Sequence, residues 1–422
     1  MRNMKDSGIP WIGEIPEDWI CSEQRFQIKL INGRAYKDSE FEKNGKYKVL
    51  RVGNLFSNPI WYSSSLELPE ENYCSDGDLL YSWSMSYAPV IWKGEKVIYH
   101  YHIWKVKLIG NLARDFTYFY LIALTDALMA EVHETTMGFI TMGIMNKSYI
   151  AVPPLKEQRK IAIFLKSKSN QIDRIIQKQQ DLIDKLKAYK QSLITETVTR
   201  GLDPSVPMKD SGIPWIGKIP ISWSVASIQH LHNGLTDGTH GTYRRLNSGR
   251  LLLSSKNVRE NGLRISDNES YISESDYKSI VANGFPQKGD VLLCCIGASI
   301  GRCTVYNYDE IYAFQRSVIF IRPGNKVISD FLMYALKSES SLIQETFLVN
   351  QSAQAGLYQG LVSKIRIPVP KIREQNIISK FLDKKCTQID ADISKRQQLI
   401  DKLKEYKKSL IYEVVTGKRE VE

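Results

Sequence analysis

The chain has 422 residues, of which 43% are hydrophobic and 24% are charged, as is ordinary for a soluble globular protein of two to four domains. Its net charge of +11 and its pI near 9.1 are typical of a protein that meets polyanions. No apolar run approaches the roughly 20 residues that cross a bilayer, and the first residues lack the apolar segment of a signal peptide, so we expect a cytoplasmic protein. The six cysteines contain no C-x-x-C pair and the histidines no metal-ligand spacing, which argues against zinc and redox-dithiol sites.

The first half of the chain begins with the motif MKDSGIPWIGEIPEDW at residues 4–19. β-Branched and aromatic runs bounded by Gly, Asn and Asp then predict strands at 47–55, 77–83 and 101–109. The apolar stretch 116–132 predicts a helix. We therefore expect an α+β domain.

A long helix is predicted after Pro153-Pro154, because proline is tolerated at a helix start and disfavours helix before it. Apolar residues recur at three–four spacing along it and form a heptad seam interrupted by Gln179. We expect the seam to contain Ile172, Ile175, Leu182, Leu186, Tyr189 and Leu193. The Gly- and Pro-containing stretch 201–207 ends the helix and links the two halves.

The second half repeats this order. Residues 208–223 read MKDSGIPWIGKIPISW, at an offset of 204 (208 − 4), and differ from the first copy at three of sixteen positions. Strands are predicted at 249–258, 289–297 and 316–324, and a helix at 329–347. The block PPLKEQRKIAIFL that opens the first long helix returns as PKIREQNIISKFL, at an offset of 217 (374 − 157), and its seam is predicted at Ile389, Ile393, Leu399, Leu403, Tyr406 and Leu410, interrupted by Arg396.

The repeat predicts a duplicated frame that carries two different globular regions. We expect domains at 1–152 and 208–369, helical segments at 153–200 and 370–422, and a linker at 201–207. The most economical partner for each apolar helix stripe is the other copy, which predicts an antiparallel pair about a pseudo-two-fold axis. The alternative is that each helix packs only on its own domain.

Loops of both globular regions combine basic, amide, hydroxyl and aromatic side chains, a mixture suited to DNA. Arg and Lys bond guanine, Asn and Gln bond adenine, and hydroxyl groups hold phosphates. The candidate contacts in the first region are Arg34, Tyr36, Lys37, Arg51, Asn54, Ser84, Ser86, Tyr87 and His102. Those in the second region are Thr239, His240, Tyr243, Arg244, Arg245, Lys256, Asn257, Ser299, Arg302, Gln315, Arg316, Gln351 and Gln354.

Enzymatic motifs are missing, so no catalytic residue is predicted. The Pro153-Pro154 pair lies between Val152 and Leu155, and therefore does not form the Asn/Asp-Pro-Pro-Tyr/Phe motif of an amino-methyltransferase. Residues 212–218 read GIPWIGK, but Ile219 follows where a phosphate-binding loop needs Ser or Thr for magnesium.

The repeated GIPWIG and E-Q motifs, the KGDVLL strand and the DGTH loop at 237–240 resemble the specificity subunits of type I restriction–modification enzymes. The resemblance covers nearly the whole chain, although Asn32 to Lys37 lacks a DGTH-type loop. It implies two target recognition domains, each reading half of a bipartite site, and helices that fix the spacer. It also implies a non-catalytic role in DNA methylation and phage defence.

The same resemblance implies partners and a docking surface. It implies double-stranded DNA, two adenine-N6 methyltransferase subunits and, through them, restriction subunits, with S-adenosylmethionine, ATP and magnesium bound by those partners and no cofactor in this chain. The predicted pairing and docking residues are Glu157, Gln158, Ile172, Leu182, Leu186, Tyr189, Leu193, Glu374, Gln375, Ile389, Leu399, Leu403, Tyr406 and Leu410. A stand-alone DNA-binding regulator without methyltransferase partners remains the alternative.

Overall fold

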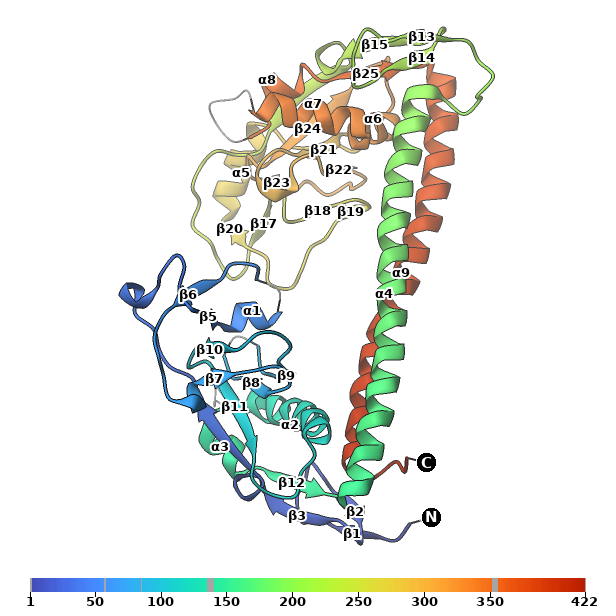
Figure 1. Cartoon of the computed structure of the whole chain (residues 1–422). Coiled ribbons are helices and arrows are strands. Elements are labelled where there is room, and N and C mark those ends of the chain that lie inside the picture. The colour runs from blue at the N-terminus through green and yellow to red at the C-terminus, as the bar shows by residue number, and fades with distance from the viewer. Residues whose placement is uncertain (1, 57, 85, 135–139, 351–355, 422) are drawn as a thin grey trace. The chain divides into compact units, whose positions relative to one another are not determined.

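Two long helices form where the sequence repeats its helical block: α4 (Leu155–Arg200) and α9 (Ile372–Val415) (Figure 1). The computed structural model describes residues 2–421 except 57, 85, 135–139 and 351–355. The chain folds as two compact units, unit 1 (residues 1–179 and 398–422) and unit 2 (residues 180–397). Each unit therefore contains one globular domain and a segment of both long helices. No helix within the described residues is long and apolar enough to cross a membrane.

The globular part of unit 1 is built on two four-stranded sheets. One has the order β4-β11-β8-β9 and is antiparallel, with β4 at Ile28–Asn32, β8 at Leu79–Ser82, β9 at Ala88–Ile91 and β11 at Ile103–Leu108. The other has the order β6-β5-β10-β7, with β5 at Tyr47–Leu50, β6 at Tyr62–Ser64, β7 at Tyr73–Cys74 and β10 at Val97–Tyr99. Two pairs complete the unit: β1 (Met4–Asp6) with β2 (Glu14–Pro16), and β3 (Ile20–Glu23) with β12 (Tyr149–Val152). Its shorter helices are α1 (Val52–Phe56), α2 (Arg114–Glu134) and α3 (Met142–Lys147).

The globular part of unit 2 repeats this plan. Its four-stranded antiparallel sheet has the order β16-β24-β21-β22, with β16 at His232–Asp237, β21 at Val291–Cys294, β22 at Cys303–Val305 and β24 at Val318–Pro323. A three-stranded sheet joins β20 (Tyr271–Ile272), β17 (Arg250–Leu253) and β23 (Ala313–Phe314). The strand pairs are β13 (Met208–Asp210) with β14 (Lys218–Pro220), β15 (Ser224–Ser227) with β25 (Arg366–Val369), and β18 (Val258–Arg259) with β19 (Gly262–Leu263). The helices are α5 (Glu274–Ala282), α6 (Ser329–Lys337), α7 (Glu339–Asn350) and α8 (Gln359–Val362).

The predicted α+β class and internal repeat are confirmed, with three local corrections. The predicted strand 47–55 ends at Leu50, because Asn54 accepts a hydrogen bond from Arg51 N and starts a helical turn. The predicted strand 249–258 breaks at an equivalent turn around Asn257. The predicted helix 329–347 is two helices, since the Ser338 hydroxyl bonds back to Ala335 O and interrupts the ladder.

Each repeated leading motif packs on the C-terminal end of a long helix. In unit 1, Ile12, Ile15 and Trp19 belong to the same core as the last turns of α9, and Tyr412 Oη donates to Trp11 O at 3.0 Å. In unit 2, Ile219 and Trp223 belong to the same core as Ile194 and Val198 of α4. The motif recurs within the chain because it fills the same core position twice.

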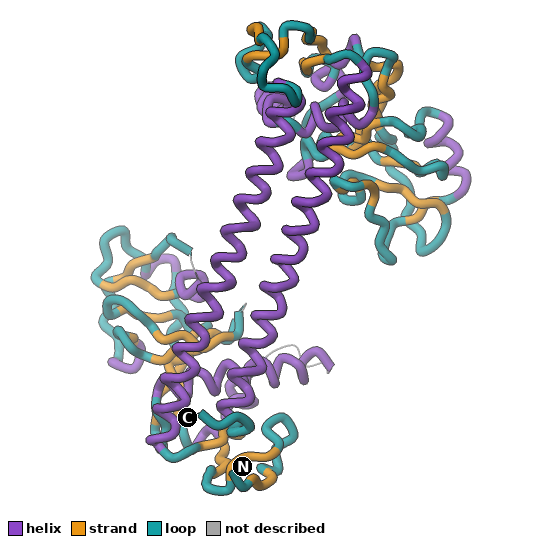
Figure 2. Tube along the Cα trace, turned by 90° about the vertical axis from the view of Figure 1, so that its right-hand side faces the viewer, coloured by secondary structure: helices purple, strands orange, loops and turns teal. Residues whose placement is uncertain are grey.

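The two helices pair antiparallel within each unit, as the sequence predicts (Figures 1 and 2). In unit 1, Lys407 Nζ lies 2.7 Å from Asp173, and Ile172 shares a core with Leu410. In unit 2, Lys190 Nζ lies 2.8 Å from Asp390. The lysines are equivalent positions of the repeat, as are the aspartates, so both units use one helix register.

Several residues of the predicted seam are exposed, and residues next to them in the chain are buried instead. Ile175, Leu182, Tyr189, Leu399 and Tyr406 are exposed by 39–56%, whereas Ile183 and Ile400 are each only 2% exposed. The buried or half-buried positions follow a regular four–three spacing, at Leu165, Ser169, Ile172, Ile176, Gln179, Ile183, Leu186, Lys190, Leu193 and Thr197 in α4. The equivalent positions in α9 are Leu382, Cys386, Ile389, Ile393, Arg396, Ile400, Leu403, Lys407, Leu410 and Val414.

Candidate nucleic-acid interface

The two globular domains carry the same loop frame at the ends of their central strands. In unit 1, Arg34 N donates to Tyr99 O and Tyr101 N donates to Arg34 O, each at 3.1 Å. In unit 2, Thr239 N donates to Phe314 O and Arg316 N donates to Thr239 O, at 2.7 and 3.0 Å. Parallel bridges Arg34–His100 and Thr239–Gln315 complete the match. Asn32-Gly33-Arg34 is therefore the structural counterpart of Asp237-Gly238-Thr239.

A glycine is required in both loops by close approach of the backbone. A Cβ atom at Gly33 would lie 2.4 Å from the carbonyl oxygens of Tyr99 and His100. At Gly238 it would lie 2.3 Å from Phe314 O and 2.4 Å from Gln315 O. Only glycine fits either position without moving the backbone, which explains why this residue alone is shared by the two loops.

In unit 2 the frame presents polar and basic side chains. Thr239 Oγ1 and Tyr243 Oη share a hydrogen bond of 2.8 Å, and His240 Nε2 lies 2.8 Å from Asp237, which also accepts from Gln359 at 2.6 Å. Arg316 is exposed, and the Gln315 side chain forms no hydrogen bond within the described residues. Arg244 and Arg245 are exposed in the same loop. The hydrogen bonds thus fix Thr239, His240 and Tyr243 in a loop that also carries exposed arginines.

In unit 1 the equivalent positions carry aromatic and basic groups. Arg34 forms an ion pair with Glu40, which raises the pKa of the guanidinium and lowers that of the carboxyl, and it lies 5.2 Å from the Tyr36 ring centroid. His100 and His102 are 4.9 Å apart between centroids. Burial, with His102 and Arg51 nearby, lowers the pKa of His100 to about 4, and burial and Arg51 lower that of His102. Both imidazoles are therefore neutral at pH 7.

A ladder of stacked rings supports this end of unit 1. Tyr81 and Trp104 stack at 5.7 Å and 13°, and Trp104 and Trp83 stack at 5.7 Å and 17°. Trp83 then meets His102 edge-on at 5.2 Å. The two domains thus place different chemistry on one backbone frame.

Two predicted base contacts, Asn54 and Asn257, are structural instead. Asn257 is 1% exposed, and its Nδ2 donates to Arg264 O at 3.1 Å and to Glu269 at 2.8 Å. Asn54 Nδ2 donates to Asn58 O at 3.0 Å and to Ile60 O at 2.8 Å. Each asparagine caps the turn that ends a strand, so its amide is not available to adenine.

The other predicted contacts lie on the surface or partly buried. Lys256 pairs with Glu269 at 2.9 Å, and hydrogen bonds from Lys256, Ser266 and Asn257 outweigh burial to lower the pKa of Glu269 to about 2. Arg51 lies 5.1 Å from the Tyr62 ring centroid. Lys37 and Ser86 are exposed, while Ser84, Tyr87, Ser299 and Arg302 are half-buried. Gln351 and Gln354 lie outside the described residues.

Glutamate and glutamine of the E-Q block hold each unit together rather than facing outward. Trp19 Nε1 donates to Glu157, and Trp223 Nε1 donates to Glu374, each at 3.0 Å. Gln158 and Gln375 are both 0% exposed. Gln158 accepts from Ala113 N at 2.7 Å and donates to two carbonyl oxygens, and Gln375 repeats all three bonds with Ile328 N, Lys326 O and Pro370 O. Their predicted role in partner docking is therefore replaced by an internal one.

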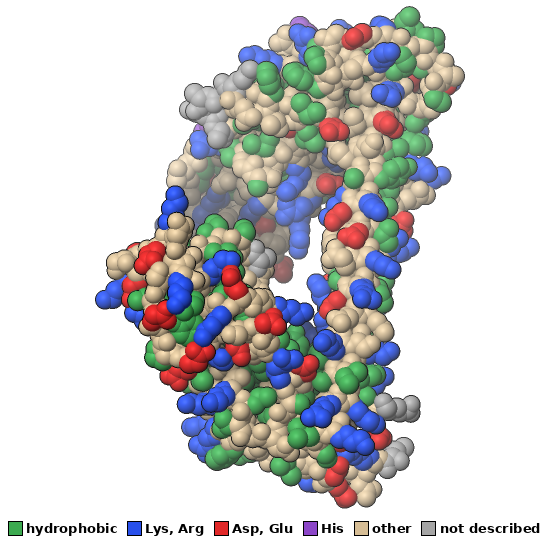
Figure 3. Space-filling view, viewed as in Figure 1, with side chains coloured by type: hydrophobic (Ala, Val, Ile, Leu, Met, Phe, Trp, Pro, Cys, Tyr) green, Lys and Arg blue, Asp and Glu red, His purple; other side chains and the backbone are tan. Residues whose placement is uncertain are grey.

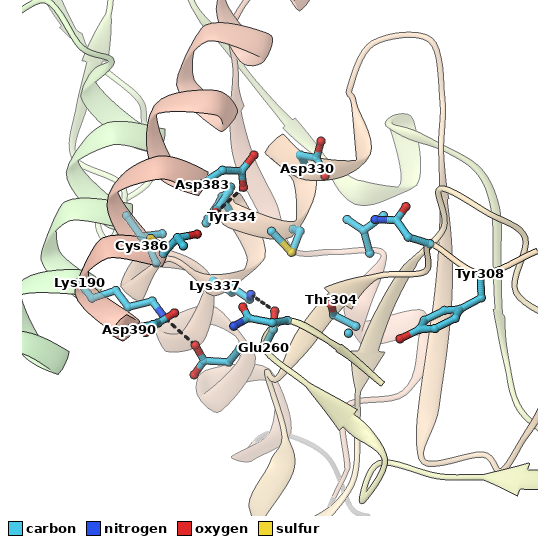
Figure 4. Close-up of a pocket in the computed structure, with 17 residues that line it drawn as sticks. Lys190, Glu260, Thr304, Tyr308, Asp330, Tyr334, Lys337, Asp383, Cys386 and Asp390 are labelled. Atoms are coloured by element: carbon cyan, nitrogen blue, oxygen red, sulfur yellow. Dashed lines mark hydrogen bonds and ion pairs between the residues drawn. The ribbon is translucent and has the colours of Figure 1, made fainter. Parts of the chain in front are cut away.

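Unit 2 also contains a cavity of about 380 Å³ between its helices and its globular part (Figure 4). Lys190 reaches from α4 to Asp390 at 2.8 Å and to Glu260 at 2.7 Å, and Tyr334 donates to Asp383 at 2.7 Å. Within the described residues no group of three or more His, Cys, Asp or Glu side chains could hold a metal ion. The polar contacts here attach the globular part to the helices.

Charge alone does not mark the interface. Lys and Arg side chains are spread over the visible surface of both units, with Asp and Glu among them (Figure 3).

The family of the chain is shown by comparison with known proteins. The family model of the type I restriction modification DNA specificity domain matches residues 16–185 and again residues 247–405, together more than half of the chain. The chain belongs to this family.

Relatives over the full length agree with this assignment. The type I restriction enzyme MjaVIII specificity subunit of Methanocaldococcus jannaschii is 26% identical over 419 residues, covering 96% of this chain and 93% of the relative. The EcoBI specificity subunit of Escherichia coli is 21% identical over 395 residues, covering 90% and 82%. A solved structure described as showing complex assembly and conformational transition of the type I R-M system shares the fold, with a TM-score of 0.67, 14% identity and coverage of 95% and 98%. This chain is thus a specificity subunit, the non-catalytic component of a restriction–modification system.

Sequence reasoning missed several residues of this specificity subunit. The sequence shows the tryptophan and the glutamate only as repeated residues of two motifs far apart in the chain. It does not show that they are in contact. Lys190 and Lys407 lie in the helix seam, where a polar residue was expected only at Gln179 and Arg396. Arg259, which directly follows the predicted strand 249–258, is not among the predicted DNA contacts.

Proposed function

We propose that this specificity subunit reads a bipartite DNA site, with each recognition domain contacting one half. The observation that carries this proposal is the repeated loop frame, in which Arg34 and His100 replace Thr239 and Gln315 at equivalent backbone positions. A frame kept twice with different side chains suits two readers of different sequences. Arg is suited to guanine and Gln to adenine in the major groove.

The proposed DNA contacts are the predicted residues without the two capping asparagines. In the second domain, Arg316, Arg244 and Arg245 are exposed, and the half-buried Gln315 directly precedes Arg316. In the first domain, Tyr36 lies beside Arg34, and Arg51 lies near His100 and His102. We retain domains 1–152 and 208–369, helical segments 153–200 and 370–422 and the linker 201–207, because β12 ends at Val152 and α4 begins at Leu155.

We further propose that the exposed apolar side chains of the helices dock two methyltransferase subunits. Leu182 and Tyr189 in unit 2 are 39% and 56% exposed, and their repeat equivalents Leu399 and Tyr406 in unit 1 are 42% and 49% exposed. Each pair is seven residues apart and lies on one helix face. Two equivalent patches suit two copies of one partner. S-adenosylmethionine, ATP and magnesium would be bound by the methyltransferase and restriction subunits, acting with this chain on cytoplasmic DNA.

Methylation sequencing tests the reading function. The chain would be expressed with its methyltransferase subunit in a methylation-free host, alongside a variant in which residues 20–150 come from another specificity subunit. We expect one bipartite motif, of which the exchange alters one half only. A change in both halves would contradict independent reading.

The docking surface has its own test. Tyr189→Asp combined with Tyr406→Asp should abolish co-purification of the methyltransferase while leaving the melting temperature within about 2 °C, because exposed substitutions away from packed features change stability little. Lys187→Gln with Lys404→Gln serves as the control on the same helices. Wild-type chain that never brings a methyltransferase with it would favour the stand-alone regulator.

A further inference from the structure

Two arginines of unit 2 converge on one oxygen atom. Arg259 Nη1 donates to Val258 O at 3.1 Å, and Arg302 Nη1 donates to the same oxygen at 3.3 Å. The two nitrogen atoms are therefore within about 6.4 Å of each other, the sum of the two bonds. A single carbonyl group compensates two full positive charges poorly.

The two acidic side chains that line the same cleft, Glu260 and Asp390, are both ion-paired with a lysine. Glu260 follows Arg259 in the chain, but Lys190 holds its carboxylate at 2.7 Å, and the same lysine holds Asp390. Within the described residues, neither Arg259 nor Arg302 forms an ion pair with a carboxylate. Both arginines line an open cleft of about 700 Å³ whose walls carry five basic side chains and two acidic ones. The cleft thus has an excess of positive charge, and both guanidinium groups are hydrogen-bonded to Val258 O.

The arginines come from the two loops that flank the recognition frame. Arg259 lies in β18, two residues after the turn at 254–257, and Arg302 lies directly before β22, with Gly301 N donating to Cys294 O at 3.1 Å. Cys294 Sγ lies 3.8 Å from Ser255 O and so joins the two loops. Ser255 N donates to Ser317 Oγ at 3.0 Å, so the first of these loops contacts the residue that follows Gln315 and Arg316 of the frame. The position favours DNA over an acidic peptide as the occupant.

Among the described residues of unit 1, no arginine lies at the position equivalent to Arg259. Because Asn54 and Asn257 cap equivalent turns, the position that corresponds to Arg259 is Phe56, which is 41% exposed. The pair is therefore not part of the repeated frame. It is a feature of the second recognition domain only.

We propose that Arg259 and Arg302 together grip one phosphate of the DNA backbone, so that the second domain anchors the duplex independently of sequence. This inference rests on the proposed function. Two guanidinium forks provide the donors that phosphate oxygens accept, and phosphate contacts position a protein without specifying bases. Unit 2 thus both reads the DNA sequence and anchors the duplex.

The test uses the methyltransferase complex of the full chain and two duplexes of equal length, one with the mapped methylation site and one without it. Arg259→Gln with Arg302→Gln should weaken binding to both duplexes by about tenfold, since a charge-assisted bond is lost in each case. The slope of log K against log salt concentration should fall by about one, as expected for one phosphate contact. Methylation sequencing should return the wild-type motif.

Control variants separate the outcomes. Lys209→Gln with Lys218→Gln removes two exposed charges from β13 and β14, away from both loops, and should leave the slope unchanged. Arg259→Lys with Arg302→Lys keeps the charge and should restore most of the slope, which also shows that the site still folds. An unchanged slope, an altered motif, or loss of the methyltransferase instead of DNA would each overturn the phosphate grip. If the wild-type complex bound both duplexes equally well, that result would instead count against the proposed function.

Discussion

The glutamine of each E-Q block is predicted to brace its own unit, and replacement of Gln158 by leucine measures that brace. The side chain is 0% exposed and satisfies three backbone groups: Ala113 N, Asn111 O and Pro153 O, at 2.7–2.9 Å. Leucine has a similar size but leaves all three without a partner. At about 1–3 kcal/mol for each unsatisfied buried group, and some gain from the apolar side chain, the expected loss is about 3–5 kcal/mol.

A loss of that size is a large share of the about 5–15 kcal/mol that stabilises a domain. Hydrogen exchange should show reduced protection over residues 103–165 and normal protection over 318–382. Gln375→Leu should reverse that pattern, because Gln375 makes the same three bonds in unit 2. Asn376→Ala is the control, since Asn376 is exposed and bonds only Ile372 O. Unchanged protection in Gln158→Leu, together with loss of the methyltransferase, would refute the internal brace and restore a docking role.

Other consequences concern the helix seam and a buried acid. In urea unfolding, Ile183→Ala should lower the free energy of unfolding by about 2–4 kcal/mol, and the neighbouring Leu182→Ala by less than about 0.5 kcal/mol. A larger loss for Leu182→Ala than for Ile183→Ala would support the predicted seam instead. Burial raises the pKa of Glu345 from 4.5 to about 8. The folded state then keeps a proton that the unfolded chain releases, so stability should fall as pH rises from about 5 to 8 and level off above that. Glu345→Gln should stabilise the protein at pH 8.5 and change little at pH 5; a parallel shift at both pH values would contradict this assignment.

The helix seam shows what periodicity alone decides. Apolar residues come in neighbouring pairs, such as Ile175 with Ile176 and Leu182 with Ile183, so two phases of the heptad fit the sequence. The seam predicted from the sequence contains no lysine. Lys190 nevertheless lies there, because its long side chain lets the amine reach Asp390 of α9.

The recognition loops show the opposite case. Their positions along the chain and most of their surface residues are predictable from composition and turn signals. The sequence does not predict that the two loops are equivalent, since Asn32-Gly33-Arg34 and Asp237-Gly238-Thr239 share only a glycine. The match is made by backbone hydrogen bonds to strands some 65–75 residues further along the chain. The two asparagines were misassigned for a related reason: an amide that suits adenine suits a turn equally well.

The proposed function requires two unlike recognition domains whose spacing along the DNA is set by the paired helices. The most direct measurement is methylation sequencing of variants in which residues are added or removed between Thr197 and Pro207, where α4 ends and the second leading motif begins. We predict that the gap between the two half-sites changes while both half-site sequences stay the same. An unchanged gap with altered half-sites would contradict the account.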